Sequence, residues 1–114
     1  MTPSQYTVCV SEASNYADKD AYISDLSLSS IWGDDPSSPI TQDRIDLLSA
    51  IYTAAHRSIK DISAAAGINN RQLADRFAIP QRTLENWSSG SRQCPTYLLL
   101  MMQEALGIYN PAID

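Results

Sequence analysis

Four side chains that can hydrogen-bond to the edges of nucleic-acid bases lie close together in the second half of the chain. They are Gln81, Arg82, Glu85 and Asn86. Arginine suits guanine, glutamine and asparagine suit adenine, and glutamate accepts from the amino group of cytosine. If Leu84 and Trp87 turn inward, helical spacing leaves all four polar side chains on the outer face. Taken alone, these residue types suit a solvated helix surface, and they also have the chemistry to contact the bases of double-stranded DNA.

An all-α fold of about five helices is predicted to position this outer face. Apolar residues recur at three- and four-residue steps across 42–57, which is the pattern of an amphipathic helix. Ser58 and Asp61 are spaced as in a capping box. Gly67 and Gly90 suit helix ends because glycine tolerates a positive φ. The predicted helices span residues 42–57, 59–66, 70–77, 81–88 and 95–106.

Residues 69–90 carry the signals of two helices joined by a short turn. Asn69 can cap the first helix, with Gln72 completing the capping box. Pro80 preorganises the first turn of the second helix. Two helices that cross at a steep angle need a small residue where they touch, and Ala74 supplies it. The pattern predicts a helix-turn-helix arrangement.

The run from Gly67 to Gly90 resembles the Cro and phage-repressor-like (XRE) helix-turn-helix family, and the match continues through Ser91–Leu98. The resemblance covers about half of the chain and implies a DNA-binding domain over residues 41–110. Its members include bacterial regulators, antitoxins and proteins of phages or conjugative elements. Ala78 departs from the pattern, because the family often has a glycine with positive φ there. An alanine held at positive φ costs on the order of 1 kcal/mol or more, so we expect a turn of altered shape.

The resemblance also implies which residues contact the DNA backbone. Asn70, at the start of the helix before the turn, would meet a phosphate, assisted by Arg71. The loop after the second helix commonly touches the backbone in this family. The predicted phosphate-contacting residues are Asn70, Arg71, Thr83, Ser91, Arg92 and Gln93.

The net charge of −5 opposes DNA binding, because the neutralisation of phosphates requires Lys and Arg. The acidic residues are concentrated in residues 1–57, which carry −5, whereas residues 58–114 are neutral. Between Gly67 and Gln93, four arginines outnumber two acids. Binding of DNA must therefore rely on a few well-aimed groups and not on a broadly basic surface.

Residues 1–40 are predicted to form an acidic N-terminal arm. Alternating apolar and β-branched residues predict a short strand at 6–11, which must pair with a partner strand or lie extended. Asp18 or Asp20 can cap a helix over 19–32. The run Gly33–Pro39 is rich in Asp, Ser and Pro and is predicted to be a loop.

No enzymatic site, cofactor site or metal site is predicted. The chain contains neither a Gly-x-Ser-x-Gly elbow nor a glycine-rich phosphate loop. Cys9 and Cys94 are far apart and suit a reduced cytoplasm better than a zinc site. The first residues lack a basic patch followed by an apolar run, and no 18-residue apolar stretch occurs. We therefore expect a cytoplasmic protein that does not enter a membrane.

Two hypotheses about partners follow from the rest of the sequence. The apolar run Leu98–Met102 exceeds one helix face, so it must be covered by the arm, by the 42–57 helix or by a second subunit. Two-fold symmetry is common for this motif, and we therefore expect a homodimer bound to DNA. The second hypothesis is a protein-interaction module or an antitoxin-like protein, in which the helix-turn-helix is a scaffold and the acidic arm binds a partner.

Overall fold

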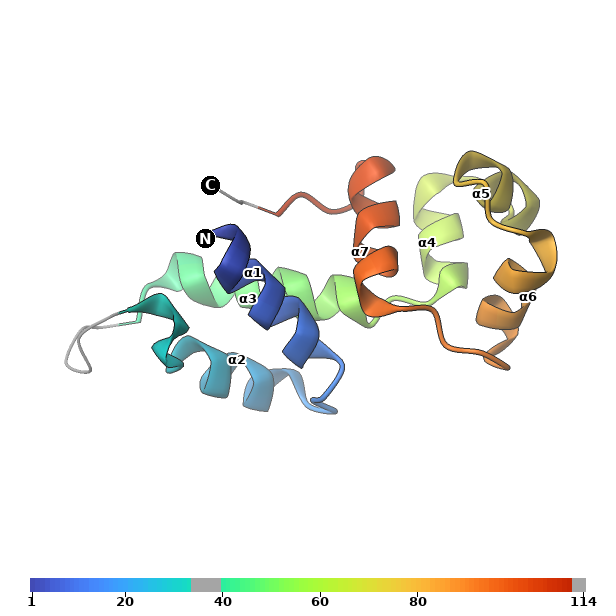
Figure 1. The fold of residues 1–114 in the computed structure, drawn as a ribbon. Coiled ribbons are helices and arrows are strands. Elements are labelled where there is room, and N and C mark those ends of the chain that lie inside the picture. Colours follow the sequence, from blue (N-terminus) through green and yellow to red (C-terminus); the bar gives the residue numbers. More distant parts are fainter. Residues whose placement is uncertain (34–39, 112–114) are drawn as a thin grey trace. The chain divides into compact units, whose positions relative to one another are not determined.

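The computed structural model describes residues 1–33 and 40–111, and every regular element within these ranges is helical (Figure 1). The described chain contains seven α-helices, α1 to α7, and one short 3-10 helix, η1. These elements divide into two compact units, with unit 1 formed by Met1–His56 and Pro111, and unit 2 by Arg57–Asn110. None of the helices in the described ranges combines the length and apolarity needed to cross a lipid bilayer. The predicted all-α class is confirmed for these residues.

Unit 1 contains α1 (Pro3–Ala13), α2 (Lys19–Ser27), η1 (Ser30–Trp32) and α3 (Gln42–Ala55). Helices α1 and α2 both pack against α3. The side chains with no exposed surface in this unit are Cys9, Ala13, Tyr22, Leu48 and Ile51. The Tyr22 hydroxyl donates a 2.8 Å hydrogen bond to the carbonyl of Cys9, which ties α2 to α1.

The predicted strand at residues 6–11 is wrong, because this segment lies in the middle of α1. Thr2 caps α1: its hydroxyl accepts from the Gln5 amide, and the Gln5 side chain accepts from the Thr2 amide. Pro3 stands at the first helical position, where its missing N–H costs nothing. A six-residue alternation without a partner strand could not outweigh these local signals.

The N-terminal region also differs from the predicted arm. Helix α2 begins at Lys19 behind its Asp18 cap but ends at Ser27, and η1 follows after two residues. Helices α1 and α2 pack on α3, and the first compact unit runs through His56. Most of the predicted loop Gly33–Pro39, residues 34–39, lies outside the described residues.

Unit 2 contains α4 (Ile59–Ala66), α5 (Asn70–Arg76), α6 (Gln81–Ser89) and α7 (Thr96–Ala105). The predicted helix ends hold to within one or two residues. Ser58 and Asp61 form the capping box of α4, and Asn69 and Gln72 form that of α5. Gly67 and Gly90 terminate α4 and α6 at φ values of +70° and +85°, as glycine permits.

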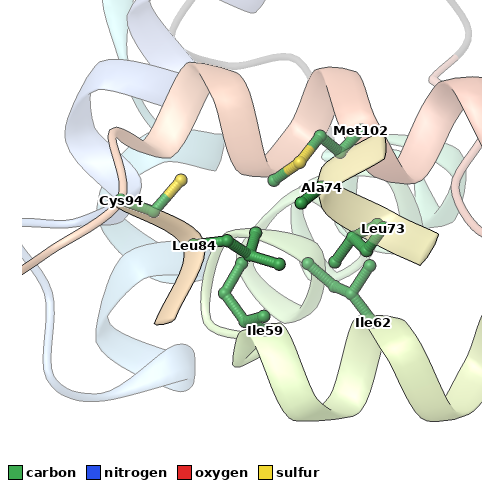
Figure 2. Packing of buried hydrophobic residues seen from close by; sticks show 7 residues of the cluster. All are labelled: Ile59, Ile62, Leu73, Ala74, Leu84, Cys94 and Met102. Atoms are coloured by element: carbon green, nitrogen blue, oxygen red, sulfur yellow. The ribbon is translucent and has the colours of Figure 1, made fainter. Parts of the chain in front are cut away.

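Buried side chains from every helix of unit 2 converge in one cluster (Figure 2). Helix α4 contributes Ile59 and Ile62, α5 contributes Leu73 and Ala74, α6 contributes Leu84, α7 contributes Met102, and the α6–α7 loop contributes Cys94. Full burial of each large apolar side chain is worth roughly 1.5–3 kcal/mol. This cluster holds α6 against α4 and α5.

The apolar run on α7 is covered mainly within the chain. Leu100 and Met102 are buried, and Leu98 and Leu99 are partly buried. One residue of the run, Met101, remains 59% exposed, and Tyr97 one turn earlier is 64% exposed. The uncovered apolar surface of α7 is therefore a pair of side chains and not the whole run.

Candidate nucleic-acid interface

The turn between α5 and α6 retains a left-handed residue although no glycine is present. Ala78 has a φ of +54° and is the one non-glycine residue with positive φ in the described chain. The Ile79 amide donates to the carbonyl of Ala74 at 2.9 Å across this turn. The expectation of an altered turn is not met, because Ala78 adopts the conformation that a glycine would adopt. Left-handed backbone costs an alanine about 1–2 kcal/mol.

Helix α6 is anchored along its inner side. Leu84 is fully buried in the cluster, and Trp87 is partly buried and packs against it. The small side chain of Ala74 is 1% exposed and lies in the same cluster, where α5 and α6 meet. With Leu84 and Trp87 inward, the opposite side of α6 faces outward.

The outward side of α6, here called the α6 face, carries all four side chains predicted to contact bases. Gln81, Arg82 and Glu85 are exposed, and Asn86 is half-buried at one edge. The amide of Gln81 donates a 3.3 Å hydrogen bond to the Glu85 carboxylate one turn later. The Arg82 guanidinium has no hydrogen bond or ion pair with any residue that the structure describes. The α6 face thus offers a free cation beside a paired amide and carboxylate.

The loop after α6 is held close to the end of that helix. The Arg92 amide donates to the Asn86 carbonyl at 3.1 Å, and the hydroxyls of Ser89 and Ser91 lie 2.7 Å apart. The side chains of the predicted loop contacts Ser91, Arg92 and Gln93 are all exposed. The backbone of Ser91 and Arg92 is therefore bonded to the end of α6, while the three side chains remain exposed.

Asn70, predicted to contact a phosphate, joins three helices through its side chain. Its side-chain carbonyl accepts from the Ser63 hydroxyl of α4 at 3.3 Å. Its amide group donates to the Ser88 hydroxyl of α6 at 3.1 Å. Ser63 is buried, and Asn70 and Ser88 are half-buried. We call this arrangement the Ser63–Asn70–Ser88 bridge.

The other two predicted phosphate contacts differ in their exposure. Arg71 is exposed in the first turn of α5 and has no hydrogen bond or ion pair with any described residue. Thr83 is half-buried, on the side of α6 that adjoins Trp87. Arg71 is therefore the more accessible of the two.

The difference in net charge is larger between the two units than between residues 1–57 and residues 58–114. Unit 2 contains six basic residues and four acidic residues, a net charge of +2. Residues 1–56 of unit 1 contain two basic and eight acidic residues, a net charge of −6. The arginines with exposed positions around α5, α6 and the following loop are Arg71, Arg76, Arg82 and Arg92. The unit that carries the α6 face is thus weakly basic.

Two kinds of residue at this site escaped the sequence prediction. Ser89 belongs to α6 and lies on its outward side, whereas the predicted helix ended at residue 88. Ser63 and Ser88 act on Asn70 from positions 7 and 18 residues away. These serines lie on other helices, at spacings that follow no helical or capping pattern. The sequence alone therefore does not predict the Ser63–Asn70–Ser88 bridge.

Cys94 belongs to the α6–α7 loop, and its side chain is buried with 8% exposed. Loss of solvation on burial raises the pKa of its thiol to about 11. The thiol is therefore neutral at physiological pH and contributes to unit 2 as a small apolar group.

No known protein family matches this sequence, and no curated protein or solved structure was found to be similar to it.

Proposed function

We propose that unit 2 is a sequence-specific DNA-binding domain of the helix-turn-helix kind, which would make the chain a transcriptional regulator of a bacterial, phage or mobile-element type. The α6 face carries the proposal. It gathers Gln81, Arg82, Glu85 and Asn86 on one side of a helix whose other side is locked into the core by Leu84. A helix with this polar face fits the major groove of B-DNA.

Each side chain has a role that follows from its chemistry. Arg82, which has no protein partner, would pair with a guanine, and Asn86 would pair with an adenine. The Gln81–Glu85 hydrogen bond would fix both side chains in the groove, with Glu85 accepting from a cytosine amino group. Arg71 and Arg92 would contact phosphates on either side.

The modest charge of unit 2 supports a particular mode of binding. Each phosphate neutralised by a cation contributes close to one unit to the slope of log affinity against log salt. With a net charge of +2 on unit 2 and −6 on residues 1–56, non-specific attraction to DNA is weak. The affinity would then come from base contacts at a preferred sequence.

A binding-site selection with the full chain and a randomised duplex library tests this proposal. We expect one sequence to be enriched at low salt and to bind more tightly than a scrambled duplex. Arg82→Ala should abolish much of that preference, whereas Lys60→Ala, which removes an exposed cation from α4 outside the interface, should retain it. Absence of enrichment by the wild-type chain at low salt would refute DNA recognition.

A homodimer is part of the same proposal. Tyr97 and Met101 lie one turn apart on α7 and are both more than half exposed, a pairing that suits contact with another apolar surface. Sedimentation of the wild-type chain at high micromolar concentration should give a dimer, and the double variant Tyr97→Ser with Met101→Gln should shift it toward monomer. A wild-type monomer under these conditions would contradict the dimer.

The charge of unit 1 favours a second candidate function, that of an interaction module whose acidic helices bind a basic partner protein. Residues 1–56 carry −6, and Leu28 is 74% exposed at the end of α2. Neutralising two exposed acids with Asp20→Asn and Asp46→Asn separates the two functions. The double variant should bind DNA slightly more tightly if unit 2 is the functional part, whereas a basic partner would bind it more weakly.

A further inference from the structure

The Ser63–Asn70–Ser88 bridge is the one side-chain hydrogen-bond path that joins α6 to another helix within the described chain. The other side-chain bonds of α6 stay within that helix or reach the adjacent Ser91. Helix α6 has no side-chain cap either, because Pro80 precedes it. The bridge therefore provides the directional link that the rest of α6 lacks.

Directional bonds and apolar contacts restrain a helix in different ways. Leu84 and Trp87 hold α6 against the core through packing, and a hydrogen bond adds a directional restraint that packing lacks. Ser88 follows Leu84 by one turn and sits near the end of α6. A hydrogen bond to Ser88 from Asn70, itself held by buried Ser63, restricts the rotation of α6 about its axis.

We infer that Asn70 is a positioning residue that sets the rotation of α6, and hence the base preference of the α6 face, through Ser63 and Ser88. This inference rests on the proposed DNA binding. The two ends of the Asn70 amide are each bonded to a serine hydroxyl, so this side chain acts inside the protein and not on a phosphate. Loss of the bridge then alters which sequence is preferred and leaves the affinity for random DNA unchanged.

Ser88 and Ser63 provide uncharged tests of this role. Ser88→Ala removes the hydroxyl that accepts from Asn70, whereas Ser88→Thr retains one. Ser63→Ala acts from a buried position on α4 that DNA cannot reach. Ile62→Val, the neighbouring core position, is the matched control because it weakens packing without changing the bridge.

The measurement is the ratio of affinities of the full chain for its selected duplex and for a scrambled duplex. A neutral hydrogen bond is worth a roughly two- to tenfold change in an equilibrium constant. We expect Ser88→Ala and Ser63→Ala to lower the ratio by that amount, Ser88→Thr to restore it and Ile62→Val to leave it unchanged. Unchanged ratios in both alanine variants, or an equal loss in Ile62→Val, overturn the inference.

Asn70→Ala separates positioning from phosphate contact. A uniform loss of affinity for selected and scrambled DNA, with a lower salt slope, would mean that Asn70 contacts a phosphate and would overturn the inference. A double-mutant cycle between Asn70→Ala and Ser88→Ala in urea unfolding reports on the bridge without DNA, and we expect a coupling of two- to tenfold in the unfolding constant. If the wild-type chain shows no sequence preference, the proposed function is refuted, and the DNA role of Asn70 is refuted with it. The double-mutant cycle still shows whether the Ser63–Asn70–Ser88 bridge exists.

Discussion

Ala74 and Ile79 are joined across the turn between α5 and α6 by a 2.9 Å hydrogen bond from the Ile79 amide to the Ala74 carbonyl. Ala74 is also the small buried residue where the two helices meet. The same residue thus sets both the closeness of the helices and the path of the chain between them. Ala78 must adopt its left-handed conformation for this bond to form.

Replacing Ala78 by glycine should stabilise the protein. Relief of the left-handed backbone gains about 1–2 kcal/mol, and the greater freedom of glycine in the unfolded chain offsets about 0.4–1 kcal/mol of it. We expect a net gain of about 0.5–1 kcal/mol in thermal or urea unfolding. Ala64→Gly, at an exposed position inside α4, is the control and should destabilise by a similar amount. A loss of stability in Ala78→Gly would mean that the turn is not left-handed.

Arg82 and Arg92 should differ in the kind of DNA affinity that they provide. Arg82→Ala should cost about 1–3 kcal/mol on the selected duplex and relax the preference at one base pair. Arg92→Ala should weaken all sequences alike and reduce the salt slope by about one. Fluorescence anisotropy titrations at several salt concentrations distinguish the two. Equal, salt-insensitive losses in both variants would refute the division of roles.

Leu84 should account for much of the stability of unit 2. It is fully buried at the centre of the cluster, so Leu84→Ala should cost about 2–5 kcal/mol through lost burial and the cavity left behind. Glu85→Ala, the next residue on the outward side, should change stability by no more than about 0.5 kcal/mol. Urea unfolding of the two variants makes this comparison, and similar losses in both would argue against the placement of α6.

Cys94 should make stability depend on pH in the alkaline range. Burial raises the pKa of its thiol from 9.0 to about 11 in the folded protein. As the pH rises, the thiol therefore loses its proton in the unfolded chain before it does so in the folded protein. The stabilisation that comes from burying the neutral thiol is complete below pH 9 and is lost as the pH rises toward 11. The fall in urea midpoint between pH 8 and pH 10.5 should be smaller in Cys94→Ala than in the wild-type protein. Identical slopes would show that this thiol ionises as freely in the folded state.

The sequence predicted the helices of unit 2 well because their signals are local. Ser58, Asn69, Gly67 and Gly90 act on residues within one turn of themselves, so their effect is readable without a structure. The α6 face also follows from helical spacing once Leu84 is placed inward.

The predicted strand at 6–11 is wrong, whereas the other features that the sequence does not predict depend on partners distant in sequence. The local capping box at Thr2 starts α1 and outweighs the alternation of this segment. The role of Asn70 depends on the approach of Ser63 and Ser88, which packing alone determines. The attachment of α3 to α1 and α2 likewise depends on tertiary contacts.

The missing cap of α6 has a consequence for isotope exchange. The first amides of any helix lack partners within the helix. Caps cover part of this deficit in α4 and α5, but Pro80 gives α6 none. Deuterium should therefore enter the backbone of α6 first at Gln81 and Arg82, while the amide of Leu84, bonded to the Pro80 carbonyl, exchanges later. Amide exchange should be slowest in the middle of α6, which faces the core. A ligand that orders the helix would be detected as slower exchange at its first turn.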